Sequence, residues 1–94
     1  MAAEPTTDAA LDRLRELLAD NDVALLDLVN RRIELVGQIK QRKDDLGVAF
    51  IDPEREAWLL DHLRRANNGR LSEAGLHELL TTLLDLTKRE LAGS

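Results

Sequence analysis

Two basic residues of this sequence, Arg32 and Lys43, have the types and the spacing to bind an anion. They are eleven positions apart, about three helical turns, so in a helix both lean from nearly the same face. Leu35 and Ile39 occupy the surface between them. A buried arginine without an anionic partner costs about 3–5 kcal/mol. The two cations therefore indicate either a structural ion pair or a site for an anionic ligand.

The segment DPERE at residues 52–56 brings further charges to a point where a loop turns into a helix. Asp52 is expected to cap that helix and Pro53 to take its first position. Arg55 opposes the positive end of the helix dipole, and Glu56 heads a stripe of leucines, so both need another explanation. An inward carboxylate requires a hydrogen-bond donor, which is either an internal arginine or the hydroxyl of a bound ligand.

Arg15 is a third cation that can serve such a site only from another chain. It precedes Arg32 by seventeen residues, about 25 Å along one helix, which is too far for it to reach a site near Lys43 in its own copy. Asn21 lies in the same series of leucines as Arg32. It has a simpler explanation, because a polar seam residue fixes the register and the oligomeric state of paired helices.

Helices must position these residues, because no alternating run of β-branched residues predicts a strand. The first helix is expected from Asp8 to about Asp45, roughly 38 residues or about 57 Å, which exceeds the diameter of a compact globule of this size. Another chain, or the rest of this one, must therefore cover it. Its residues with the 3-4 spacing of an interhelical seam are Leu11, Leu14, Leu18, Asn21, Leu25, Leu28, Arg32, Leu35 and Ile39.

Two shorter helices are expected after a break at Gly47, which suits the left-handed residue at a helix end. The second begins at Asp52 and stops before the turn-rich NNGR of residues 67–70. Ser72 is expected to cap the third, and Gly93 to end it. We therefore expect an all-α fold with one long, one short and one medium helix.

Length and composition allow one small domain, residues 8–94, behind a flexible tail at residues 1–7. A net charge of −5, spread along the chain, argues against a nucleic-acid binder. The chain has no cysteine, and His62 and His77 lack partners at metal-ligand spacing, so neither a disulfide nor a metal site is expected. No run of about 18 apolar residues indicates a membrane span, and we expect a soluble cytoplasmic protein.

Three stretches together resemble the all-α (AroQ-type) class of chorismate mutases: LRELLADND at 14–22, LVNRRIELVGQIKQRK at 28–43, and DPERE at 52–56. The resemblance covers nearly the whole chain, from about Asp8 to Leu91. It implies an intertwined helical homodimer that rearranges chorismate to prephenate. That step is unimolecular, so the resemblance implies neither a cofactor nor a metal.

The resemblance also implies roles for the charged residues. Arg15 from the partner chain and Arg32 would hold the two carboxylates of the substrate. Lys43 would donate to the ether oxygen, where negative charge develops as the bond breaks. Glu56 would bind the ring hydroxyl. Lys43, Arg32 and Glu56 are thus the expected catalytic residues.

Further substrate contacts are implied for Asp52, through its backbone, for Arg55, which would line the same wall, and for Thr87, which would contact a carboxylate. Leu91 departs from the family pattern, since many members have a glutamine there that also donates to the ether oxygen. Glu90 is adjacent but turned by about 100°. If Glu90 took that role it would have to be protonated.

Three other interpretations remain open from the sequence. The first is a mutase of 4-amino-4-deoxychorismate in a secondary pathway, because an amino group would also suit Glu56. The second is an isochorismate pyruvate-lyase, which the intact DPERE segment disfavours. The third is a non-catalytic helical dimerisation module, in which the polar seam residues only fix pairing. A separate shikimate-pathway enzyme is a further expected partner, and the sequence does not identify it.

Overall fold

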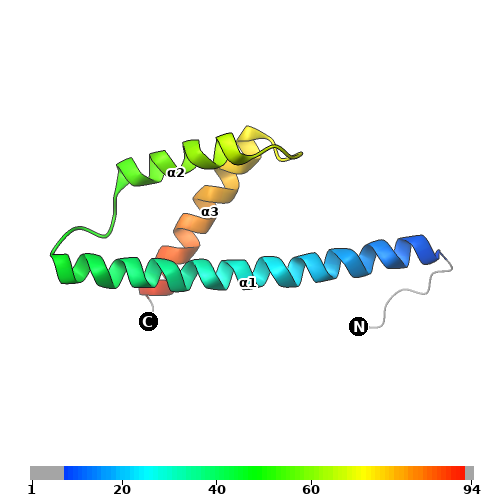
Figure 1. Cartoon of the computed structure of the whole chain (residues 1–94), viewed down its shortest axis with the longest axis horizontal. Coiled ribbons are helices and arrows are strands. Elements are labelled where there is room, and N and C mark those ends of the chain that lie inside the picture. The colour runs from blue at the N-terminus through cyan, green and yellow to red at the C-terminus, as the bar shows by residue number, and fades with distance from the viewer. Residues whose placement is uncertain (1–7, 93–94) are drawn as a thin grey trace. The chain divides into compact units, whose positions relative to one another are not determined.

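The computed structural model describes residues 8–92, and its ordered elements are three helices (Figure 1). Helix α1 spans Ala9–Leu46 with 38 residues, α2 spans Pro53–Ala66 with 14, and α3 spans Glu73–Ala92 with 20. The prediction of an all-α fold with one long, one short and one medium helix is confirmed. The predicted tail at 1–7 and the predicted helix end at Gly93 lie outside the described residues.

The second and third helices begin at the predicted capping residues, Asp52 and Ser72, and the first begins after Asp8. The carboxylate of Asp8 accepts a hydrogen bond from the backbone N–H of Leu11 at 3.1 Å. Asp52 accepts from the N–H of Arg55 at 3.1 Å, with proline in the first turn behind it. The hydroxyl of Ser72 accepts from the N–H of Gly75 at 3.0 Å. These bonds satisfy N–H groups that have no partner within the helix.

The α1–α2 loop begins at Gly47, which has a φ of +70°. In this left-handed conformation the N–H of Gly47 donates to the carbonyl of Asp44 at 3.1 Å, and that of Val48 donates to Lys43 at 3.0 Å. Glycine reaches a positive φ without a steric penalty, whereas a residue with a Cβ does not. The chain can therefore leave α1 abruptly and turn toward Asp52.

The structure consists of two compact units that divide within α1, after Arg32. In the first unit, the large apolar side chains from Leu11 to Leu28 are between 39% and 64% exposed. Burying apolar surface contributes about 25 cal/mol per Å² of stabilising free energy, so packing another surface against these side chains would stabilise the helix.

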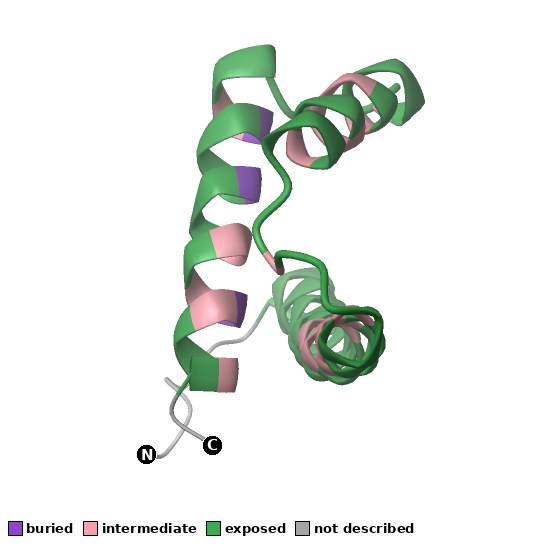
Figure 2. Ribbon diagram, turned by 90° about the vertical axis from the view of Figure 1, so that its left-hand side faces the viewer, coloured by how far each residue is buried: buried purple, intermediate pink, exposed green. Residues whose placement is uncertain are grey.

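The second unit contains the remainder of α1 together with α2 and α3. Its most buried residues all belong to α3, and they are Leu76, Leu80 and Thr87 (Figure 2). Helix α2 packs against α3. The side chain of Leu91 reaches α1, where its Cδ2 lies 3.3 Å from the point at which a side chain on Gly37 would begin. Among the described residues, no helix is both long and apolar enough to cross a membrane.

Two loop glycines provide a test of this backbone geometry. Gly47→Ala is expected to lower the free energy of unfolding by about 1–2 kcal/mol, because the φ of +70° is strained for alanine. Gly69→Ala is the matched control, since a Cβ there would meet only Asn67 Oδ1, at an ordinary 3.8 Å. Urea unfolding at one protein concentration measures both. Equal losses would contradict the left-handed turn at Gly47.

Candidate active site

One ion pair joins Glu56 of α2 to Lys88 of α3. Lys88 Nζ lies 3.1 Å from Glu56 Oε2, and the two side chains are 35% and 32% exposed. Glu56 therefore does face inward, as predicted, and its donor is a lysine rather than an arginine. At this exposure the ion pair is expected to contribute about 1 kcal/mol or less to stability.

Sequence reasoning missed Lys88, although a signal for it was present. Lys88 follows the apolar stripe of α3 at a spacing of four residues from Leu84 and precedes Leu91 by three. A cation in that stripe and a carboxylate at the head of the stripe of α2 suit each other. Because the two residues are 32 positions apart, helical periodicity alone does not pair them.

Lys43 lies near the end of α1 and is held by the loop that follows. Its Nζ donates to the carbonyl of Phe50 at 2.9 Å and stands 6.0 Å from the centre of the Phe50 ring. Both residues are partly buried. An ammonium group has three N–H donors, and this hydrogen bond uses one of them. The loop thus orients Lys43 and leaves its other donors for a ligand.

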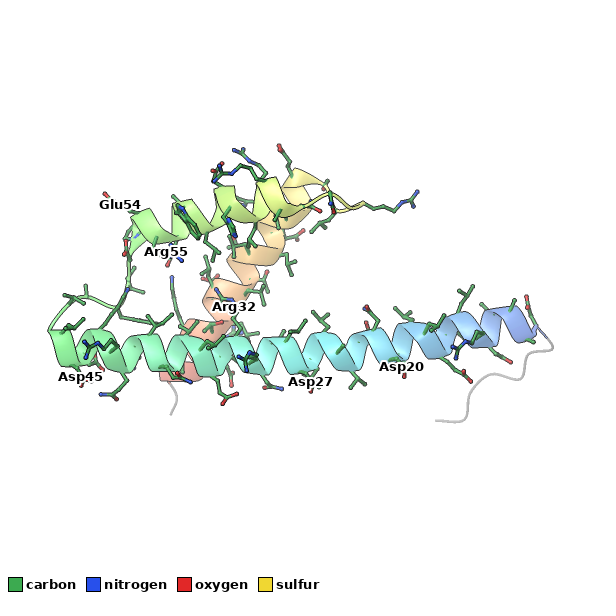
Figure 3. All side chains as sticks on the ribbon, viewed as in Figure 1. Asp20, Asp27, Arg32, Asp45, Glu54 and Arg55 are labelled. Carbon is green, nitrogen blue, oxygen red and sulfur yellow. The ribbon has the colours of Figure 1, made fainter. Side chains whose placement is uncertain are left out.

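Arg55 lies in the first turn of α2 (Figure 3), where its cationic side chain lies over an aromatic ring. Its guanidinium lies 3.8 Å from the centre of the Trp58 ring, and the same ring stacks on His62 at 4.7 Å with 10° between the planes. A cation over an indole gains about 0.5–1 kcal/mol at an exposed site. This contact explains a charge that the helix dipole disfavours.

The last turns of α3 carry the remaining candidates. Thr87 is only 3% exposed, and its hydroxyl donates to the carbonyl of Leu83 at 2.7 Å. Leu91 is partly buried and faces Gly37 of α1, whereas Glu90 is exposed. The structure therefore turns Leu91, and not Glu90, toward the helix that carries Lys43.

Arg15 and Arg32 belong to the first unit, on the part of α1 that ends at Arg32. Arg15 is exposed and Arg32 is partly buried. The second unit holds the other candidates: Lys43, Asp52, Arg55, Glu56, Thr87 and Leu91. Within residues 8–92, no group of three or more His, Cys, Asp or Glu side chains is arranged to hold a metal ion.

The chemistry that these groups support is the binding and polarisation of a small anion with a hydroxyl group. The ammonium of Lys43 donates hydrogen bonds, the carboxylate of Glu56 accepts them, and Thr87 places a hydroxyl next to Lys88 in the sequence. Since the side chains of Lys43, Glu56 and Lys88 are only partly exposed, their charges act in a medium of lower dielectric than water.

Two substitutions of Asp52 distinguish its role as a helix cap from a role of its negative charge. Asp52→Ala is expected to lower the free energy of unfolding by about 1 kcal/mol, because Arg55 loses the acceptor of its N–H. Asp52→Asn is expected to retain most of that stability, since asparagine caps helices as well as aspartate does. Urea unfolding followed by circular dichroism measures both. A loss in Asp52→Asn as large as in the alanine variant would show that the charge, rather than the cap, matters.

Comparisons with known proteins place the chain in a family. The family model of chorismate mutase type II matches residues 14–90. A protein named T-protein, from Enterobacter agglomerans, is 40% identical over 57 residues, which make up 61% of this chain and 15% of that protein. The resemblance drawn from the sequence is thereby confirmed. The chain belongs to the chorismate mutase type II family, a family of isomerases.

Proposed function

We propose that this protein is a chorismate mutase, which rearranges chorismate to prephenate in aromatic amino-acid or related shikimate-derived biosynthesis. The observation that carries the proposal is the family match over residues 14–90. It includes every basic and acidic residue that the site needs. These are Arg15, Arg32, Lys43, Asp52, Arg55 and Glu56.

The proposed mechanism needs no covalent step by the protein. Chorismate rearranges once it is held in a compact, chair-like shape, so positioning supplies part of the rate enhancement. As the ether bond breaks, its oxygen becomes negative, and a donor already aimed at it stabilises the transition state more than the ground state. Lys43 is that donor, because the carbonyl of Phe50 holds its Nζ by a 2.9 Å hydrogen bond.

Glu56 fixes the ring end of the substrate in this mechanism. Its Oε2 is engaged by Lys88 at 3.1 Å, and its Oε1 is the atom that would accept a hydrogen bond from the ring hydroxyl. A carboxylate that is already ion-paired keeps one orientation. The substrate is thus held at the hydroxyl by Glu56, at the ether oxygen by Lys43 and at its carboxylates by arginines.

The proposal requires a homodimer, because Arg15 and Arg32 are about 25 Å apart along α1 and cannot share one small ligand within a chain. A second copy running antiparallel along the whole of Ala9–Leu46 would place its Arg15 level with Lys40 of the first copy. That level lies between Arg32 and Lys43. The same pairing would cover the exposed leucines of the first unit.

Arg32 and its neighbour Arg31 offer a matched test of the activity. Purified protein is expected to convert chorismate to prephenate, followed by loss of the diene absorbance and identification of the product. Arg32→Ala is expected to lower kcat/KM by about 100-fold or more, as for loss of one charged donor in an oxyanion site. Arg31 is exposed, whereas Arg32 is partly buried, so Arg31→Ala is expected to stay within a few-fold of wild type.

The fold of both arginine variants is checked by circular dichroism. A folded wild-type dimer that leaves chorismate unchanged would refute the proposed function. Equal effects of Arg31→Ala and Arg32→Ala would refute the role of Arg32. A stable, fully active monomer in sedimentation would refute the role of Arg15.

Mixing two inactive variants tests whether Arg15 acts from the partner chain. Arg15→Ala and Lys43→Met are each expected to lose activity. After they are mixed in equal amounts and allowed to exchange subunits, half of the dimers are mixed, and each of these has one intact site. Activity is therefore expected to recover to about one quarter of wild type, as a two-fold symmetric interface requires. If Arg15 instead serves its own chain, no mixed dimer has an intact site, and activity does not recover.

A further inference from the structure

The contact between Lys88 and Glu56 suggests how this site selects its substrate, a question that family membership leaves open. We infer that Lys88 is a specificity-determining residue, which makes the Glu56 subsite accept a neutral ring hydroxyl and reject a ring ammonium. The inference rests on the proposed function. It also decides between two of the substrates that the sequence left open, chorismate and 4-amino-4-deoxychorismate.

The geometry of the ion pair places Lys88 next to the Glu56 carboxylate. Lys88 Nζ is 3.1 Å from Glu56 Oε2, and each side chain is about two thirds shielded from solvent. The pair joins α2 to α3, and Lys88 directly follows the buried Thr87. Lys88 therefore lies beside the carboxylate that would receive the substrate, and not on the outer face of α3.

The positive charge of Lys88 changes what the Glu56 carboxylate can bind. A lone, partly buried carboxylate would bind a ring ammonium at least as well as a hydroxyl, because the ammonium also neutralises it. In this protein Lys88 already neutralises Glu56. A hydroxyl needs only an acceptor, and Oε1 supplies one. The Glu56 subsite therefore has an acceptor to offer but no uncompensated charge.

A ring ammonium would meet a penalty at the same place. Bound to Oε1, it would stand within about 6 Å of Lys88 Nζ, a distance at which like charges in a partly shielded site repel. Glu56 cannot fully compensate two cations. The structure thus combines an attractive element for the hydroxyl with a repulsive one for the ammonium, which is how specific sites discriminate between close analogues.

The experiment compares two substrates that differ only in this group. Chorismate and 4-amino-4-deoxychorismate, whose amine is protonated at neutral pH, are assayed separately, and kcat/KM is measured for each. Wild type is expected to prefer chorismate. Lys88→Met removes the charge while keeping the length of the side chain, and it is expected to shift the ratio of the two kcat/KM values toward the amino compound by about tenfold or more.

Two further variants serve as controls. Lys88→Arg keeps the positive charge and is expected to keep the preference for chorismate. Arg89→Met removes a charge from the next position of α3, where the side chain is exposed, and is expected to leave the ratio unchanged. Circular dichroism verifies folding, and Lys88→Gln replaces Lys88→Met if the latter does not fold.

The outcomes separate this inference from the proposed function. Turnover of chorismate by wild type with an unchanged ratio in Lys88→Met would overturn the inference and leave the proposed function standing. A wild-type preference for the amino compound would also overturn it. Loss of both activities in folded Lys88→Met and Lys88→Gln would show that Lys88 is needed for catalysis rather than selection. Turnover of neither compound by folded wild type would overturn both proposals.

Discussion

The length of α1 is the constraint on which the rest of this protein depends. A helix of 38 residues presents more apolar side chains than so short a chain can cover, and those from Leu11 to Leu28 are indeed 39% to 64% exposed. Exposed leucines at seam spacing favour association with another helix. The same length separates Arg15 from Arg32 by about 25 Å. A second copy would therefore both cover the helix and complete the proposed site.

Much of the fold was predictable because its signals are local. Each helix start depends on a side chain that bonds a backbone N–H three residues later, as at Asp8, Asp52 and Ser72. The end of α1 depends on a single glycine, Gly47, with a positive φ. Such bonds involve neighbours in sequence, so residue type and spacing are enough to place them. The 3-4 spacing of leucines predicted the helices between these ends.

The site was predictable in its members and less so in their partners. Glu56 was expected to face inward, but its partner Lys88 is 32 residues away, and the packing of α2 on α3 decides that contact. Arg55 was recognised as out of place, and the reason for it, Trp58, lies only three residues on. The contact between Arg55 and Trp58 can be inferred from helical spacing. The contact between Glu56 and Lys88 can be seen only in the tertiary structure.

Leu91 shows what the departure from the family pattern means physically. Its side chain packs against Gly37, which has no side chain of its own, so an apolar group fills the space between α3 and α1 at this position. A glutamine there would add a donor to the ether oxygen. A leucine offers no such donor. The exposed Glu90 points elsewhere. In the proposed mechanism, stabilisation of the ether oxygen would therefore depend on Lys43, and the 2.9 Å hydrogen bond to the carbonyl of Phe50 orients its Nζ.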